Sequence, residues 1–192
     1  EGDVLIGVAI TDGTDDIMLF SDAGKAVRFA EADVRPMGRT ARGVRGMMIE
    51  GGQSVICMLV SKNDELSVLT ATENGYGKRT RVTEYPKHGR GTKGVMAIAS
   101  SERNGAVVGA VLVDTRDEIM LISTGGVLIR TRVEDIREMG RSTQGVTLIN
   151  LDGGTRLAGV EKVIESDSEA DIDSDGESES AGEADAGGED AE

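Results

Sequence analysis

The sequence has few of the residues on which several protein classes depend. Its 192 residues include one Cys, one His, two Pro, two Tyr, two Phe and no Trp. A single cysteine excludes an intrachain disulfide framework, and one Cys with one His excludes a zinc finger. No apolar run approaches the roughly 18 residues of a membrane span. We therefore expect a cytoplasmic protein with no membrane partner, whose core consists of Val, Ile, Leu and Met.

Negative charge is abundant but unevenly placed. The chain has 35 acidic and 21 basic residues, a net charge of −14. Residues 165–192 contain 13 of the acids, none of the bases and only one large apolar side chain, an Ile. Such a segment cannot bury enough apolar surface to offset the entropy of ordering. We predict that residues 165–192 form a disordered acidic tail, and that residues 1–164, with a net charge of −1, form the folded part.

A repeat with a period of 51 residues runs through the folded part. Residues 38–44, Gly-Arg-Thr-Ala-Arg-Gly-Val, return as Gly-Arg-Gly-Thr-Lys-Gly-Val at 89–95 and as Gly-Arg-Ser-Thr-Gln-Gly-Val at 140–146. Self-similarity at a fixed period is typical of solenoids and propellers. The same step relates three glycines and three arginines, namely Gly24, Gly75 and Gly126, and Arg28, Arg79 and Arg130.

Each repeat is expected to contain four short strands. In the first repeat these are the apolar runs at 4–10, 17–20, 26–29 and 43–49. The two middle runs are joined by a short turn ending in Gly, which tight hairpins require where φ is positive. Four short strands in about 50 residues are typical of propeller blades, so we predict an all-β, propeller-like fold of four-stranded blades.

The predicted repeats span residues 3–53, 54–104 and 105–155, and a last strand is expected within residues 156–164. Three blades do not close a ring, because propellers typically contain at least four. We therefore expect further blades upstream of Glu1.

Positive charge recurs at one phase of the repeat. The windows 24–45, 75–96 and 126–147 hold 16 of the 21 bases with six acids, whereas the rest of residues 1–164 has a net charge of −11. Equal phase means equal position in an array of blades, so these bases are expected to line one edge. A curved strip of Lys and Arg can follow a bent polyanion such as duplex DNA. The predicted phosphate contacts are Lys25, Arg28, Arg39, Arg42, Arg45, Lys78, Arg79, Arg81, Lys87, Arg90, Lys93, Arg130, Arg132 and Arg141.

Binding at this edge is expected to be directed at the DNA backbone. The sequence offers no recognition helix, no metal finger and few aromatic residues for stacking on bases, so recognition should be largely independent of sequence. We expect no catalytic residue, cofactor or metal ion in this chain, because neither Tyr76 nor Tyr85 has an acidic cluster beside it. The alternative interpretation of the basic windows is that they are solvated loop charges.

Several stretches resemble the C-terminal domain of the DNA gyrase A subunit. They are Asp-Ile-Met-Leu-Phe-Ser at 16–21, Val-Arg-Gly-Met at 44–47, Asn-Gly-Tyr-Gly-Lys-Arg-Thr at 74–80 and Glu-Tyr-Pro at 84–86. The resemblance covers essentially all of residues 1–164. It implies a six-bladed β-pinwheel, about half of it present here, whose rim wraps double-stranded DNA. It also implies a heterotetramer of two A and two B subunits that uses ATP and Mg²⁺ to introduce negative supercoils.

Two features of that family have no counterpart in the chain. The glutamine-arginine-glycine-rich box of its first blade is absent, and so are the catalytic tyrosine and metal-binding carboxylates of its upstream domains. We therefore expect this chain alone to be non-catalytic. Two other interpretations stay open: the related C-terminal domain of the topoisomerase IV A subunit, and a propeller that serves as a platform for protein partners.

Overall fold

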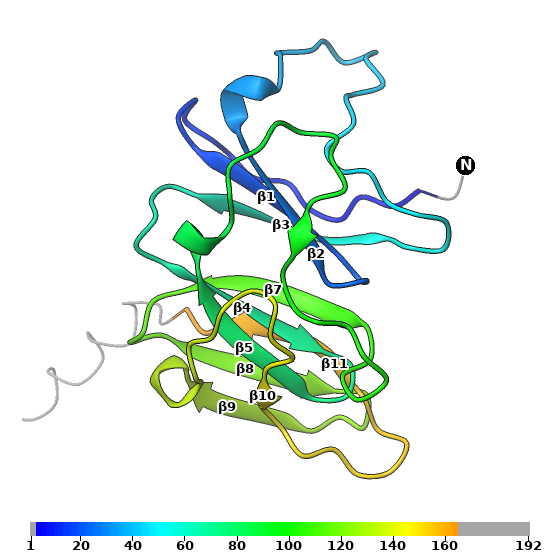
Figure 1. The fold of residues 1–192 in the computed structure, drawn as a ribbon, viewed down its shortest axis with the longest axis vertical. Helices are drawn as coiled ribbons and strands as arrows, with labels where there is room; N and C mark the ends of the chain where they lie inside the picture. Colours follow the sequence, from blue (N-terminus) through cyan, green and yellow to red (C-terminus); the bar gives the residue numbers. More distant parts are fainter. Residues whose placement is uncertain (1–2, 165–192) are drawn as a thin grey trace, which may run out of the picture.

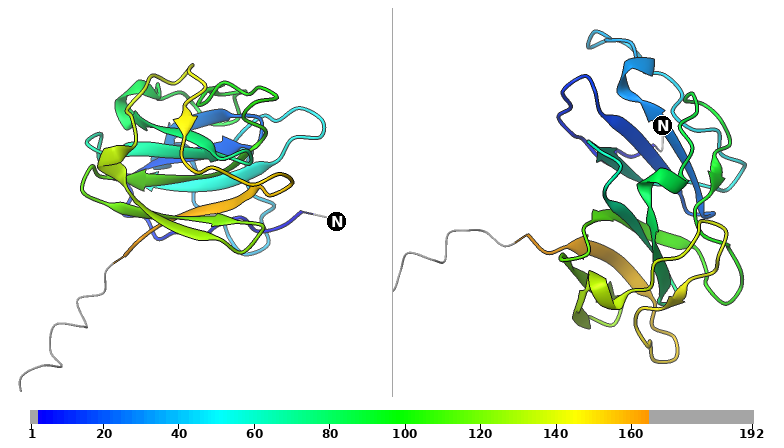
Figure 2. Two further views of the ribbon diagram at one scale, coloured as in Figure 1. Left: turned by 90° about the horizontal axis from the view of Figure 1, so that it is seen from below. Right: turned by 60° about the vertical axis from the view of Figure 1, so that its left-hand side comes forward.

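The structure, a computed structural model, describes residues 3–164, and the predicted acidic tail lies outside them (Figure 1). The described chain forms three antiparallel sheets and no α-helix. The predicted all-β, propeller-like fold is thus confirmed, and the sheets follow one another through the molecule (Figure 2). Among these residues no helix is long and apolar enough to span a membrane.

Each sheet is built around one hairpin. In the first sheet the hairpin is β1 (Asp16–Ser21) and β2 (Lys25–Ala30). In the second it is β4 (Ser67–Thr72) and β5 (Tyr76–Arg81), and in the third it is β8 (Glu118–Ser123) and β9 (Leu128–Arg132). A short 3-10 turn follows each hairpin; these turns are η1 (Glu31–Asp33), η2 (Val82–Glu84) and η3 (Val133–Asp135).

The outer strands of each sheet come from the next repeat. The order of the first sheet is β3-β1-β2-β6, where β3 (Val55–Ser61) and β6 (Val95–Met96) belong to the second repeat. The second sheet, β10-β5-β4-β7, takes β7 (Val107–Val113) and β10 (Val146–Thr147) from the third repeat. Each of these two sheets is therefore shared between two consecutive repeats.

This exchange of strands explains two sequence predictions that are wrong. The sequence predicts strands at residues 4–10 and 43–49, yet neither segment forms one. Their equivalents in the later repeats pair with the hairpin of the preceding repeat, and the described chain has no hairpin ahead of β1. Without that partner, apolar side chains such as Val4 and Ile10 are 81% and 96% exposed.

The third sheet is open at the opposite end of the array. Its order is β11-β8-β9, where β11 (Leu157–Lys162) takes the place that β7 has in the second sheet. No described strand pairs with the outer side of β9, and Val127 and Leu128 there are 51% and 60% exposed. In the described residues, the array thus has two apolar segments without a partner at one end and the unpaired outer side of β9 at the other.

The apolar core lies between neighbouring blades. One cluster joins Met18 and Phe20 of β1 to Val68 of β4 and Ala110 of β7. Another joins Leu69 of the second sheet to residues of the third, including Ile119, Leu121 and Val160. Burial of apolar side chains between sheets, at about 25 cal/mol per Å², is the main force that holds the blades in sequence.

The hairpin glycines provide a matched test of this packing. Gly75 has φ +81°, and a Cβ there would lie 2.5 Å from the carbonyl oxygen of Ile149 in the next repeat. Gly126, the equivalent glycine of the third repeat, has φ +80° but nothing within 4 Å. Gly126→Ala should cost about 1 kcal/mol, from backbone strain alone. Gly75→Ala should cost about 2–4 kcal/mol, because overpacking adds to that strain.

Chemical denaturation of the two variants measures the difference. Equal losses of unfolding free energy in Gly75→Ala and Gly126→Ala would show that contact with the following repeat does not constrain the turn.

Candidate nucleic-acid interface

The three Gly-Arg loops, residues 38–44, 89–95 and 140–146, run beside one another along the array. Each follows its 3-10 turn, and the three loops lie in the order light blue, green and yellow down Figure 1. Backbone hydrogen bonds join the segment after each of the first two loops to the next loop: Met48 N–H donates to the carbonyl of Thr92 (2.8 Å), and Ala99 N–H donates to that of Thr143 (3.0 Å). The loops therefore form one continuous series.

The arginines of the second and third loops make equivalent contacts with the repeat before them. Arg90 donates from Nη1 to the carbonyl of Arg45 (3.3 Å) and from Nε to that of Asp33 (3.0 Å). Arg141 donates from Nη1 to the carbonyl of Met96 (3.0 Å), the equivalent of Arg45. Both side chains are half-buried. Each therefore links two consecutive repeats while part of it stays accessible to solvent.

Most of the predicted phosphate contacts lie at the surface. Lys25, Arg79, Arg90 and Arg141 are half-buried. The exposed ones are Arg39, Arg42, Arg45, Arg81, Lys87, Lys93, Arg130 and Arg132. Some of these already face acids: Arg130 pairs with Glu118, and Lys93 lies 3.2 Å from Glu50. The exposed members are available to an external anion at the cost of such weak surface pairs.

Two predicted contacts, Arg28 and Lys78, are instead buried. Arg28 is 7% exposed and donates to Asp16 (2.6 Å), to Asp64 and to the carbonyl of Val82 (3.0 Å). Lys78 is 0% exposed, and its ammonium donates to oxygens of the third Gly-Arg loop. Their burial argues against direct phosphate contact, so we remove both from the candidate interface. Phase alone does not distinguish them, because it fixes the position of a side chain along the blade but not its direction.

Arg79 is partly exposed and also contacts the following repeat. Like Arg28, it extends toward the 3-10 turn of that repeat: its Nε donates to the carbonyl of Ile136 (2.8 Å), and its Nη1 donates to Thr115 Oγ1 (2.9 Å). Its half-buried side chain is thus part of the joint between the second and third repeats.

The seven basic residues absent from the predicted set are also exposed. Arg35 and Arg137 lie in the same phase windows as the others, which is the signal that would have included them. Arg103 lies outside the windows, and its guanidinium stacks over the ring of Tyr76 at 4.1 Å from the centroid. That contact gives Arg103 a role in holding the hairpin of the second sheet.

The two tyrosines have structural positions. Tyr85 is 1% exposed and packs edge-on against Phe20, with ring centroids 6.0 Å apart. Burial raises the pKa of its phenol above the ordinary value, which is the opposite of what a nucleophile needs. Tyr76 lies under Arg103 at the start of β5. Neither tyrosine is placed for nucleophilic attack.

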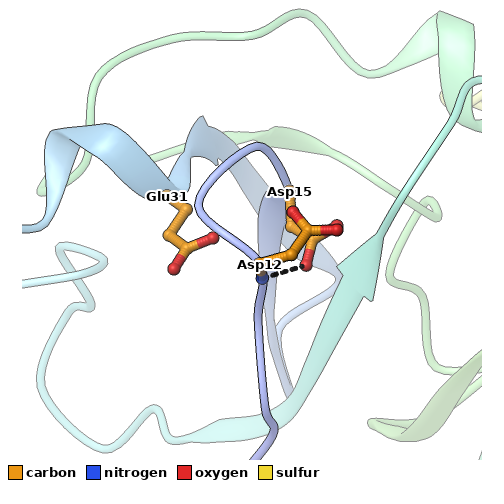
Figure 3. Close-up of side chains that lie close together, drawn as sticks. All are labelled: Asp12, Asp15 and Glu31. Carbon is orange, nitrogen blue, oxygen red and sulfur yellow. Dashed lines mark hydrogen bonds between the residues drawn. The ribbon is translucent and has the colours of Figure 1, made fainter.

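One carboxylate cluster lies away from the Gly-Arg loops. Oxygens of Asp12, Asp15 and Glu31 fall within 4.8 Å of one another (Figure 3). The loop before β1 accounts for them, since Asp15 accepts from Asp12 N–H (3.3 Å) and Glu31 accepts from Gly13 N–H (2.8 Å). Asp114 and Asp117 form the same turn in the third repeat. The cluster is therefore a turn motif of the repeat, without a further sign of a ligand.

The strand exchange, the 51-residue period and the serial Gly-Arg loops define a propeller-type repeat domain. The sequence profile of the family described as DNA gyrase C-terminal domain, beta-propeller, matches residues 15–62, 66–114 and 117–163. The chain therefore belongs to the DNA gyrase C-terminal domain family, and it is a non-catalytic domain. The sequence-based resemblance to this family is confirmed.

Individual relatives agree with this assignment. The chain is 54% identical to the DNA gyrase A subunit of Pseudomonas aeruginosa over 86% of its own length and 18% of that protein. It is 51% identical to the DNA gyrase A subunit of Escherichia coli strain K12 over 90% of its length and 20% of that protein. The chain thus spans about a fifth of the curated relatives it matches.

Solved structures share the fold. The DNA gyrase A C-terminal domain superposes with a TM-score of 0.73 at 32% identity, covering 79% of this chain and 51% of that one. The C-terminal domain of DNA topoisomerase IV superposes with a TM-score of 0.77 at 28% identity, covering 82% and 49%.

Proposed function

We propose that this chain is a DNA-wrapping module that binds the duplex backbone along its series of Gly-Arg loops. The observation that carries the proposal is the set of backbone hydrogen bonds that link the segment after one loop to the next loop, because it supports an arrangement in which basic residues of equal phase follow one another along the array. Phosphates of a bent duplex follow a regular spacing that a repeated set of Lys and Arg can meet. The exposed and half-buried residues of this set are the proposed contacts, with Arg35 and Arg137 added and Arg28 and Lys78 removed.

The fold supports binding of the backbone over reading of bases. The described residues form short strands, loops and 3-10 turns, with no α-helix to enter a major groove. Guanidinium and ammonium groups recognise phosphate irrespective of sequence. We infer that affinity varies little between duplexes of equal length and different sequence.

A wider role follows from the family. We propose that the whole protein is the A subunit of DNA gyrase, which forms a heterotetramer with the B subunit in the cytoplasm and negatively supercoils DNA with ATP and Mg²⁺. Those two ligands belong to other parts of that assembly. We also propose that upstream blades complete the array, since the chain covers 51% of the gyrase domain it superposes on. The matched domain of DNA topoisomerase IV leaves that enzyme as the alternative holoenzyme.

Salt dependence tests the DNA-binding proposal. If about six phosphates are neutralised, the logarithm of the binding constant should fall with the logarithm of salt concentration at a slope near −5. Fluorescence anisotropy with a labelled duplex between about 50 and 200 mM salt measures this slope. A flat response, or no binding at the lowest salt concentration, would overturn the proposal and favour a platform for protein partners.

A further inference from the structure

Lys78 is the most fully enclosed charged side chain near the Gly-Arg loops. It starts on β5 of the second sheet and is 0% exposed. Its ammonium donates to the carbonyls of Gly140 (2.6 Å), Arg141 and Thr143 (3.1 Å), and it also lies 3.1 Å from Thr143 Oγ1. One nitrogen thus faces four oxygens, all of them from the third Gly-Arg loop.

This arrangement is particular to one of the three repeats. The residues equivalent to Lys78 are Val27 in the first repeat and Ile129 in the third. An apolar side chain is therefore compatible with the blade at this position. Burying a lysine is costly unless its ammonium is well hydrogen-bonded, because the charge is removed from water. The other two repeats have apolar residues at this position, so Lys78 has a function that is specific to the second repeat.

The acceptors show what that function is. A Gly-rich loop has many backbone conformations of similar energy. Three of the loop's carbonyls converge on one cation, which selects a conformation in which these oxygens face the interior. Gly145 contributes to the same fixed path, since a Cβ there would lie 2.4 Å from the carbonyl of Gly77. Lys78 and the turn glycine together leave the loop little freedom.

We propose that Lys78 is a positioning residue, whose buried ammonium fixes the third Gly-Arg loop in the form that presents Arg141 to the DNA backbone. It contacts no phosphate itself. The proposal rests on the DNA-binding function proposed above. It explains how a lysine of the basic windows serves the interface from inside the blade.

The test compares Lys78→Met with the unchanged chain by hydrogen exchange and by DNA binding. Methionine retains much of the length of the side chain and resembles the apolar residues of the other repeats. The amides of residues 140–145 should exchange at least about 10-fold faster in the variant. The salt slope of DNA binding should fall in magnitude by about 1, the loss of one phosphate contact.

Lys162→Met is the matched control. It removes the same charge from a lysine outside the basic windows, where the ammonium lies 2.6 Å from Asp117. Both the exchange of residues 140–145 and the salt slope should stay unchanged in this variant. If Lys78→Met does not fold, Thr143→Val removes one acceptor without removing charge and should shift loop exchange in the same direction.

A pH profile separates loop positioning by a charge from mere packing. Burial lowers the pKa of Lys78 to about 8, an effect that Arg141 reinforces and Glu84 opposes. The positive form that holds the loop is present below this pH and lost above it. DNA affinity of the unchanged chain should therefore fall between about pH 7 and 9.5 by up to about 10-fold, and Lys78→Met should lack this fall.

The two proposals fail in different ways. Unchanged exchange of residues 140–145 in folded Lys78→Met would overturn the role of Lys78 whatever the DNA result. Faster exchange with unaltered affinity and salt slope would overturn its link to DNA. Absence of DNA binding by the unchanged chain would overturn the proposed function, while hydrogen exchange would still decide whether Lys78 fixes the loop.

Discussion

Simultaneous reversal of Arg39, Arg90 and Arg141 to Glu should weaken DNA binding by roughly 10²- to 10³-fold at about 0.1 M salt. Each of the three occupies the same position in its Gly-Arg loop. A phosphate contact contributes about 0.9 to the salt slope, so losing three should reduce its magnitude by nearly 3. The decrease should be equal on duplexes of different sequence, because the proposed contacts are with the backbone.

A control with the same change of charge shows whether position matters. Lys62, Arg116 and Lys162 lie outside the basic windows, and their reversal to Glu also changes the net charge by −6. This variant should retain the salt slope to within one phosphate contact. Equal losses in the two triple variants would mean that DNA responds to net charge alone, and the series of loops would then have no special role. Circular dichroism of both variants checks that the sheets persist.

Replacement of Arg28 by Met should lower the free energy of unfolding by about 3 kcal/mol, the range for breaking a buried ion pair. Arg28 and Asp16 are each 7% exposed, and their contact is 2.6 Å. The same guanidinium reaches the carbonyls of Val82 (3.0 Å) and Tyr85 (3.3 Å) in the second repeat. Its loss leaves the carbonyl of Tyr85 and part of Asp16 unpartnered, although Tyr85 N–H still donates to the carbonyl of Val82 (3.0 Å) and Lys87 still lies 2.7 Å from Asp16.

The matched comparison is an ion pair at the surface. Arg81 lies 2.8 Å from Glu138, with the two side chains 66% and 37% exposed. Arg81→Met should change stability by less than about 1 kcal/mol, because exposed pairs contribute little. Urea unfolding of both variants gives the difference directly. A loss from Arg28→Met no greater than that from Arg81→Met would contradict a structural role for Arg28, and would return it to the candidate DNA contacts.

The sequence predicted what depends on periodicity. The step of 51 residues located the three hairpins, and the turn glycines Gly24, Gly75 and Gly126 all have positive φ, between +79° and +81°. The family resemblance identified the class of domain. Both the 51-residue period and the family resemblance depend on which residue types occur at which positions, and this can be read directly from the sequence.

The sequence could not show which strands pair or which charges face inward. A run such as 43–49 shares an initial Gly-Val and an apolar fifth residue with its later equivalents, yet the described chain offers it no partner hairpin. Arg28 and Lys78 are indistinguishable by phase from exposed neighbours. Their direction depends on carbonyls 54 and 65 residues away along the chain, those of Val82 and Thr143. These long-range contacts leave no local trace.

Because each hairpin takes its flanking strands from the repeat that follows, the array has a direction. A repeat completes its predecessor and is itself completed by its successor, so adding units at one end would lengthen the proposed DNA-binding surface without rebuilding the repeats already present. The same arrangement makes a break between two repeats more damaging than the loss of one blade. The sheet before the break loses its outer strands, and the strands after the break lose the hairpin with which they pair.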